Sequence, residues 1–199
     1  MKLNEIENII LQCKKCERLC NVNPYPMPHI QYSKKSNILC VARNPGLENV
    51  IPDEITPIEF MEFYRQKWYD CRISKYLRSL LGDDIVKNDL FFTNICKCSS
   101  PKNSQLLSNE VENCKQYLID QIEIIKPKII ITFGSDAIYS LLNKKINEAF
   151  CKQLKYNNIP VISLFHPSYF IYASDKTITK KQSIILNRIR KLYERQFQL

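Results

Sequence analysis

The sequence predicts an α/β fold, a single-domain α/β/α sandwich built around a four-stranded parallel central sheet. Two observations predict it. Four short apolar runs, bounded by polar or turn residues, are typical of buried strands: Asn37–Ala42, Leu90–Ile95, Lys128–Phe133 and Pro160–Phe165. Stretches of helical periodicity separate these runs, and such alternation indicates a parallel sheet with helices on both faces.

The helices are expected between the strands and after the last one. Pro57 suits the first turn of one helix, Gly82 the end of the next, and a third ends just before Pro127. The expected helices are Ile58–Gln66, Ile73–Leu81, Glu110–Ile125, Asp136–Leu142 and Ile178–Phe197.

We expect residues 1–199 to form one domain, because this length suits one sizeable core and no repeat or low-complexity linker divides the chain. No apolar stretch approaches membrane-spanning length, and Glu5 and Glu7 make the amino terminus unlike a signal peptide. A cytoplasmic protein with reduced thiols is therefore expected.

The net charge of +9 indicates a polyanionic partner, since Lys and Arg release condensed counterions when they meet phosphates. A solvated helix face explains such charge equally well, so charge alone leaves the partner open. Part of the excess lies near the carboxyl terminus, in Lys176, Lys180, Lys181, Arg188, Arg190, Lys191 and Arg195.

Two pairs of cysteines stand out among the nine. Cys13 and Cys16 form C-x-x-C, and Cys98 and Cys114 lie sixteen residues apart. Four soft thiolates suit an iron–sulfur cluster or a zinc ion, and composition does not separate the two. Scattered burial better explains three others: Cys40, Cys71 and Cys151.

Polar residues stand at or just after the end of each predicted strand. They are Arg43–Gly46, Asn94, Gly134 with Ser135, and His166–Ser168. Functional groups of parallel α/β folds gather at the carboxyl ends of the strands. The sequence therefore predicts a site at that edge of the sheet.

Several motifs together resemble one family. They are CKKC at Cys13–Cys16, ARNPG at Ala42–Gly46, TNICKC at Thr93–Cys98, IKPKIIITFG at Ile125–Gly134 and HPSY at His166–Tyr169, with Asn103, Glu110 and Cys114 at matching spacing. They resemble the uracil-DNA glycosylase superfamily, and most closely its family-four, iron–sulfur branch. The resemblance spans most of the chain.

The resemblance implies that Cys13, Cys16, Cys98 and Cys114 hold a [4Fe–4S] cluster with a structural role. Zinc stays open as an alternative, because four thiolates at this spacing also suit zinc. Cys20 and Cys96 are extra thiols, for which simple burial or a free surface thiol is the favoured interpretation.

The first motif departs from family four, which usually carries G-E-A-P-G. Ala42 and Arg43 replace the Gly and Glu, and Asn44-Pro45-Gly46 is similar to the G-x-N-P-G turn of the mismatch-directed and single-strand-selective branches. There the Asn orients the attacking water, so Asn44 is assigned this catalytic role and Arg43, Asn44 and Pro45 the substrate pocket. An ordinary turn is the alternative.

The other motifs supply the remaining roles. The resemblance implies that His166 donates to the departing base oxygen, where charge develops in the transition state. Asn94 is expected to read the flipped base, since a carboxamide fits the edge of uracil and misfits that of cytosine. His29 has no motif around it and is interpreted as structural.

An aromatic residue is expected to stack on the extruded base. Alignment with the leucine-rich helix of the family places Tyr69 there. Trp68, Tyr64 and Phe63 are rival candidates, and a core aromatic role is the alternative.

The expected function is a monofunctional, monomeric DNA glycosylase that excises uracil from single- or double-stranded DNA in base excision repair. Hypoxanthine, xanthine or a phage-type modified base is an alternative substrate. Two other classes stay open: a non-catalytic or regulatory nucleic-acid-binding protein that retains the fold, and a structural four-thiolate zinc module.

Overall fold

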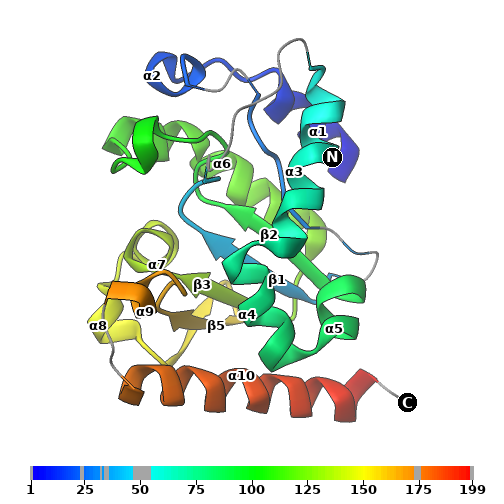
Figure 1. The fold of residues 1–199 in the computed structure, drawn as a ribbon, viewed down its shortest axis with the longest axis vertical. Coiled ribbons are helices and arrows are strands. Elements are labelled where there is room, and N and C mark those ends of the chain that lie inside the picture. The colour runs from blue at the N-terminus through cyan, green and yellow to red at the C-terminus, as the bar shows by residue number, and fades with distance from the viewer. Residues whose placement is uncertain are drawn as a thin grey trace.

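The computed structural model describes residues 2–22, 25–31, 33, 36–46, 55–172 and 176–197. Within them it shows an α/β fold around a five-stranded sheet in the order β2-β1-β3-β5-β4 (Figure 1). The strands are β1 (Ile38–Ala42), β2 (Leu90–Asn94), β3 (Ile129–Phe133), β4 (Gln153–Tyr156) and β5 (Ile159–Leu164). All four predicted strands are present and pair in parallel.

The predicted count of four strands is wrong, because β4 adds an antiparallel strand at the sheet edge. It reaches β5 through Asn157 and Asn158, whose φ angles of 45° and 67° are both left-handed. Two such residues form the two-residue hairpin loop that suits the strand twist. The side chains of β4 alternate between exposed and half-buried positions, so the strand lacks the continuous apolar run of a central strand.

Helices cover both faces of the sheet, and each of the five predicted helices is present. The first predicted helix begins at Pro57, where Thr56 and Glu59 form a capping box. The helices are α1 (Leu3–Leu11), α2 (Glu17–Cys20), α3 (Pro57–Asp70), α4 (Arg72–Leu81), α5 (Asp83–Asn88), α6 (Ser108–Ile125), α7 (Ser135–Leu142), α8 (Ile146–Ala149), α9 (Tyr169–Tyr172) and α10 (Lys176–Phe197), with a 3₁₀ turn at Pro101–Asn103.

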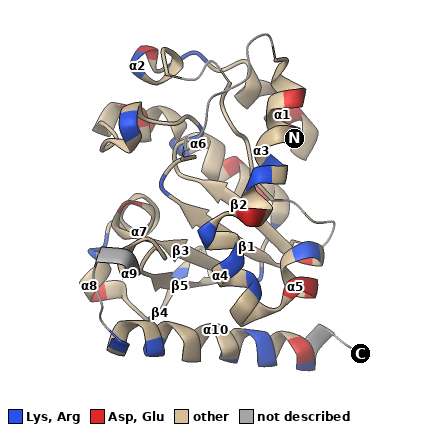
Figure 2. Cartoon of the chain, in the orientation of Figure 1, with Lys and Arg blue, Asp and Glu red and all other residues tan. Residues whose placement is uncertain are grey.

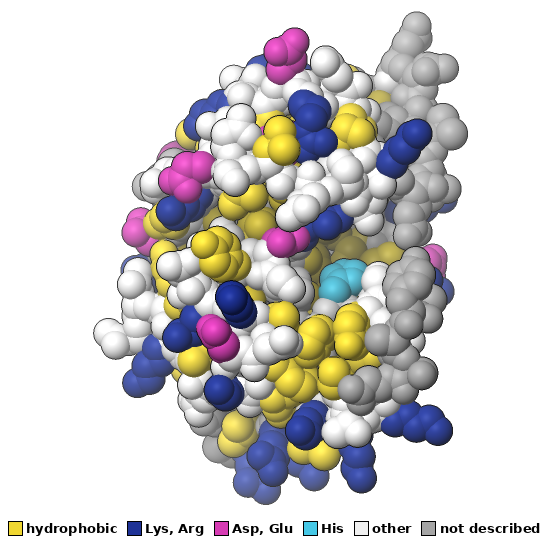
Figure 3. Space-filling view, turned by 90° about the vertical axis from the view of Figure 1, so that its left-hand side faces the viewer, with side chains coloured by type: hydrophobic (Ala, Val, Ile, Leu, Met, Phe, Trp, Pro, Cys, Tyr) yellow, Lys and Arg dark blue, Asp and Glu magenta, His cyan; other side chains and the backbone are white. Residues whose placement is uncertain are grey.

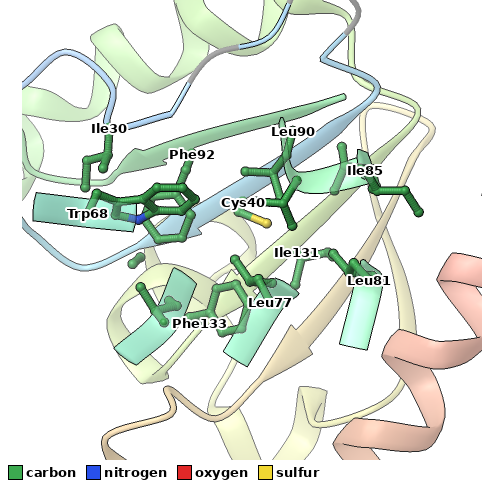
Figure 4. Packing of buried hydrophobic residues seen from close by; sticks show 14 of the residues in the cluster. Ile30, Cys40, Trp68, Leu77, Leu81, Ile85, Leu90, Phe92, Ile131 and Phe133 are labelled. Atoms are coloured by element: carbon green, nitrogen blue, oxygen red, sulfur yellow. The ribbon is translucent and has the colours of Figure 1, made fainter. Parts of the chain in front are cut away.

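The two faces of the sheet form separate apolar clusters, since neighbouring residues of a strand point to opposite sides. On one face Cys40, Phe92 and Phe133 pack against Trp68 and Leu77, as Figure 4 shows. The other face packs against α6, α7 and α8 through residues that include Leu39, Val41, Leu118, Ile138 and Ala149.

The amino-terminal helices form a third cluster beside α6. Ile6, Ile10 and Leu19 of α1 and α2 pack with Tyr117 and with three buried cysteines: Cys96, Cys98 and Cys114. This cluster lies at the upper end of the molecule in Figure 1, away from α10. It joins two segments of the chain that are about eighty residues apart in the sequence.

The last helix, α10, lies along the lower side of the molecule and packs on α4 (Figure 1). Leu186 and Ile189 are buried on its inner side. Its basic residues give it the blue bands seen in Figure 2, and seven of them are exposed: Lys176, Lys180, Lys181, Arg188, Arg190, Lys191 and Arg195. Among the helices in the described ranges, none has the length and apolar character needed to span a membrane.

The parallel register brings the carboxyl ends of four strands to one edge. Ala42 pairs with Asn94, and Phe133 pairs with Leu164. Because β2 and β3 lie on opposite sides of β1, the strand order reverses there, and such a switch point is where open α/β sheets bind ligands.

The core predicts a clear contrast between two leucines. Leu77→Ala removes a fully buried side chain of α4 and should lower the free energy of unfolding by about 2–5 kcal/mol. Leu192→Ala, at a position of α10 that is 55% exposed, is the matched control and should change it by less than about 0.5 kcal/mol. Urea denaturation of both variants tests this, and equal losses would contradict the packing described.

Candidate active site and cysteine cluster

The carboxyl edge of the sheet is hollowed around a histidine side chain, coloured cyan in Figure 3. The chain has two histidines, and His29 is fully buried elsewhere. His166 lies two residues after the end of β5, and apolar side chains border the hollow. The site predicted from the strand ends therefore has a visible concavity.

The hydrogen bonding of His166 fixes its tautomer. The backbone N–H of Ser168 donates to Nδ1 over 3.2 Å, so the proton of the neutral ring lies on Nε2. Burial, assisted by Arg43 and Arg72, lowers the pKa of His166 to about 4. At neutral pH the ring is thus an uncharged Nε2–H donor.

Gly134 allows β3 to turn close to His166. Its φ of +88° is a backbone conformation that side chains rarely adopt, and a Cβ there would lie 3.9 Å from the His166 Cβ. The glycine thus lets α7 begin directly beside the histidine.

Asn44 lies in the turn after β1 with its amide orientation fixed. Its Nδ2 donates to Pro45 O and to Ser100 Oγ, both over 3.3 Å. Its Oδ1 accepts from Arg43 Nε over 2.8 Å. An amide oxygen has a second lone pair, so Oδ1 can still accept from a water molecule.

Arg43 is held by protein groups on several sides. Besides Asn44, its Nη2 donates to Asn103 O over 3.0 Å and to Asn103 Oδ1 over 2.6 Å. Its Nε lies 3.9 Å from Asp136 Oδ2. The predicted role of Arg43 in substrate binding stays a prediction, whereas the structure shows it connecting the turn after β1 to the loop after β2.

Asn94 ends β2 with its side chain buried at 1% exposure. Its Nδ2 has no hydrogen-bond partner among the described residues. Buried donors are nearly always paired in folded proteins, and an unpaired one is costly. This amide therefore carries an unused donor at the edge where Asn44 and His166 lie.

Lys97 anchors the end of β2 from inside. Its ammonium donates to Thr93 Oγ1 over 2.8 Å and to Asn94 O and Gln121 Oε1 over 2.7 Å each. Three acceptors satisfy the three donors of an ammonium. Burial lowers the pKa of Lys97 to about 8, and the group stays mainly charged at neutral pH. Lys97 is thus a support for Asn94.

The structure does not bring Tyr69 to this group through any contact it describes. The Tyr69 ring is covered by Arg78, whose guanidinium carbon lies 3.9 Å from the ring centroid, and Lys87 lies 5.6 Å away. Lys87 precedes β2, whereas Asn94 ends it. Of the rival aromatics, Tyr64 donates to Gly46 O over 2.6 Å and so contacts the turn after β1. Stacking by Tyr69 stays a prediction.

The four predicted cluster cysteines gather in the third apolar cluster. Cys98 and Cys114 are buried in it, and Cys13 and Cys16 pack against it. The pKa of Cys16 and that of Cys98 are both raised, mainly by burial and also by the neighbouring thiols. Within the described ranges no set of three or more His, Cys, Asp or Glu side chains is arranged to hold a metal ion.

Polar contacts hold the two cysteine segments together. Asn113 Nδ2 donates to Cys16 Sγ over 3.4 Å. Arg18 makes a two-pronged contact with Glu110, with Nε donating to Oε1 over 2.7 Å and Nη2 to Oε2 over 2.6 Å. This paired geometry is the strong form of an Arg–carboxylate contact. It gives Glu110, found from its spacing to Cys114, a structural role.

The extra thiols differ in environment. Cys96 is fully buried, with its sulfur 4.0 Å from that of Cys114, and the hydrogen bond between them lowers the pKa of Cys114. Cys20 is only half-buried and lies near enough to Cys98 to affect its pKa. The predicted description of these two as buried or surface thiols agrees with their exposure.

His29, the other histidine, is buried in the protein interior. It lies in the interior between α1 and α3, with Nε2 2.7 Å from Arg65 Nη2 and Nδ1 3.2 Å from Glu7 Oε1. Burial lowers its pKa to about 3, and its ring packs on Phe91. The structural interpretation made from the sequence fits this placement.

Comparison with known proteins agrees with this arrangement. A type-4 uracil-DNA glycosylase of Sulfurisphaera tokodaii is 27% identical over 180 residues, which cover 85% of this chain and 76% of the relative. One of Archaeoglobus fulgidus is 23% identical over 181 residues, covering 85% and 83%. One of Saccharolobus solfataricus is 30% identical over 145 residues, covering 73% and 61%.

A family profile gives the assignment. The profile described as "Uracil DNA glycosylase superfamily" matches residues 29–191, which contain all strands of the sheet and the hollow. The chain therefore belongs to the uracil-DNA glycosylase superfamily.

Proposed function

We propose that this protein is a DNA glycosylase that hydrolyses the N-glycosidic bond of uracil in DNA, the first step of base excision repair. The observation that carries the proposal is the arrangement of Asn44, Asn94 and His166 on one edge of the sheet, each with a defined hydrogen-bonding state. The named activity of the relatives supports it.

Base recognition is assigned to Asn94. Its unpaired Nδ2 donates to O4 of uracil, and its Oδ1 accepts from N3–H. Cytosine presents an amino donor and an unprotonated ring nitrogen at the same positions, so it opposes both groups. The buried ammonium of Lys97 donates to the backbone carbonyl of Asn94 and so helps to fix the position of this residue. The base reaches this pocket by leaving the stack.

Bond cleavage is assigned to Asn44 and His166. Asn44 Oδ1 orients a water molecule towards C1′, and the water oxygen bonds there as the glycosidic electron pair leaves with the base. The proton of the water passes to solvent, and the base anion is protonated after departure. His166 donates Nε2–H to O2 of the base, where negative charge develops. Arg43 and Arg72 add positive potential on the same side.

An aromatic side chain of α3 is assigned to stack on the flipped base. Tyr69 is the residue favoured by alignment, and Tyr64 is favoured by its contact with Gly46 beside Asn44. Comparing Tyr64→Ala with Tyr69→Ala for binding of uracil-containing DNA distinguishes them, since a stacking contact is worth about 1–3 kcal/mol.

The cysteine set fits a [4Fe–4S] cluster held by Cys13, Cys16, Cys98 and Cys114. The donors are four thiols gathered in one apolar cluster, and four cysteine thiolates are the donor set that an iron–sulfur cluster takes. When bound, the group would cross-link the amino-terminal helices to the loop after β2. It takes no part in the bond cleavage.

One assay distinguishes a glycosylase from a non-catalytic nucleic-acid-binding protein. Incubation with a uracil-containing oligonucleotide followed by hot alkali cleaves the strand only where the base has been released. We expect cleavage at uracil, and a panel of oligonucleotides with hypoxanthine, xanthine and other modified bases ranks the substrates. No cleavage with any base would support the binder.

The roles proposed for Asn44 and His166 predict similar losses of excision rate when either side chain is removed. Asn44→Ala and His166→Ala should each slow single-turnover excision by about a hundredfold, because each removes a positioning or charge-stabilising contact. DNA affinity should stay nearly unchanged, and the double variant should lose less than the product of the two. Asn88→Ala, at an exposed asparagine before β2, is the control. Unchanged rates in both single variants would exclude this mechanism.

Base preference should change in Asn94→Asp. The substitution replaces the donor that faces O4 with an acceptor, so excision of uracil should slow and the rate ratio of uracil to cytosine should fall. Single-turnover rates on matched oligonucleotides measure the ratio. A ratio equal to that of the unmodified protein would remove Asn94 from base reading.

Cluster ligation predicts which cysteines matter. Cys98→Ala and Cys114→Ala should lose bound iron and the broad visible absorption, and should unfold at lower temperature, since metal-binding free energy is folding free energy. Cys20→Ala and Cys96→Ala are the controls and should retain iron. Full iron content in Cys98→Ala or Cys114→Ala would count against the ligand set, and bound zinc in place of iron would favour the zinc alternative.

A further inference from the structure

A buried glutamine of α10 contacts the peptide that leads to His166. Gln182 is fully buried. Its Oε1 accepts from Phe165 N over 2.7 Å, and its Nε2 donates to Phe165 O over 3.2 Å and to Tyr76 Oη over 3.1 Å. Both donors of the amide are therefore used, together with its acceptor.

The Phe165 peptide needs these contacts because it lies beyond the sheet. The pairing of β3 with β5 ends at Phe133 and Leu164, and Gly134 N then donates to Leu164 O. Phe165 N and O follow the last paired residue and are met by the Gln182 side chain. The amide supplies two hydrogen bonds to this peptide in the place where a neighbouring strand would give them.

The surrounding side chains restrain the same segment. The Phe165 ring lies 4.8 Å from that of Phe150 and 4.6 Å from that of Tyr169. On the other side of the histidine, Tyr169 N donates to His166 O over 2.8 Å. The position of His166 thus depends on what holds Phe165 before it and the short α9 after it.

We infer that Gln182 is a positioning residue for His166, which holds the preceding peptide so that Nε2–H points at the departing base. The inference rests on the proposed function for its kinetic consequence. It makes α10 part of the support of the active site, although this helix carries none of the motif residues. A glutamine is suited to this role because its carboxamide accepts and donates side by side and does not ionise.

The test uses Gln182→Met in the full-length protein, which keeps the length of the side chain and removes the hydrogen bonds. Single-turnover excision from a uracil-containing oligonucleotide should slow by about ten- to a hundredfold, the loss expected from misplacing a catalytic group by up to 1 Å. Affinity for uncleaved DNA should stay within about twofold, since by this reasoning Gln182 does not contact the substrate. Ile189→Val, two turns further along the buried side of α10, is the control for packing and should keep the rate.

Nitrogen-15 NMR of the histidine ring provides a readout that packing alone does not move. The unmodified protein should show the Nε2–H tautomer set by the Ser168 N–H contact. Gln182→Met should show a mixture of tautomers, and Ile189→Val the single one. This readout does not require activity, so it tests the inference even if the protein excises no base and the proposed function fails.

Gln182→Leu provides the second variant. Its side chain has no hydrogen-bonding atom, so both contacts to Phe165 are lost and its rate should fall as in Gln182→Met. A folded Gln182→Met with unchanged rate and an unchanged ring spectrum would overturn the inference. If Gln182→Met does not fold, an unchanged rate and ring spectrum in Gln182→Leu would overturn it.

Discussion

Parallel pairing of β1, β2, β3 and β5 determines which side chains can meet at the site. Each strand contributes the residue at its carboxyl end or one or two positions beyond, and these include Asn44, Asn94 and His166. A slip of one residue in any pairing would turn the side chains of that strand to the opposite face. The apolar clusters on both faces oppose such a slip, since it would expose Phe92 or Val41 and their neighbours. The packing of the core therefore also fixes the strand register on which the geometry of the site depends.

The unusual turn after β1 is integrated with its surroundings. Arg43 stands where the family-four pattern has Glu, and its guanidinium contacts Asn44, Asn103 and Asp136 at once. Asn103 lies in the loop between Cys98 and Glu110, so the turn is connected to the segment that carries the cysteines. A cation at this position also suits the proposed chemistry, in which negative charge develops on a leaving base. The contacts of Arg43 thus account for an arginine at a position where the family-four pattern has a glutamate.

The elements and residues that could be predicted are those with a local signal. The four parallel strands are buried on both faces, so each is a continuous apolar run, whereas β4 sits at the edge with alternating exposure and gave no such run. The Asn157-Asn158 pair was the signal for its hairpin. The short helices α5, α8 and α9 span four to six residues, too few to show periodicity.

The same distinction applies to the candidate site. Asn44, Asn94 and His166 stand in short motifs at strand ends, and Arg43 and Glu110 were found by their positions within or beside motifs. Ser100 and Gln182 act through contacts with residues 56 and 17 positions away, which leave no local pattern. Tyr69 was placed by alignment of one helix, yet tertiary contacts with Arg78 and Lys87 occupy its ring. Long-range contacts of this kind require the folded chain.

The contact between Gln182 and Phe165 has a consequence for biosynthesis. Proteins are made from the amino terminus, and the ribosome adds about 5–20 residues per second. All five strands and the histidine emerge before α10. Until that helix is made, the sheet face that Leu186 covers stays exposed and the Phe165 peptide lacks its contacts with Gln182. The nascent chain therefore passes through a stage with exposed apolar surface and an unanchored histidine. A chaperone would bind the protein at that stage, and a chain truncated before α10 would remain in it.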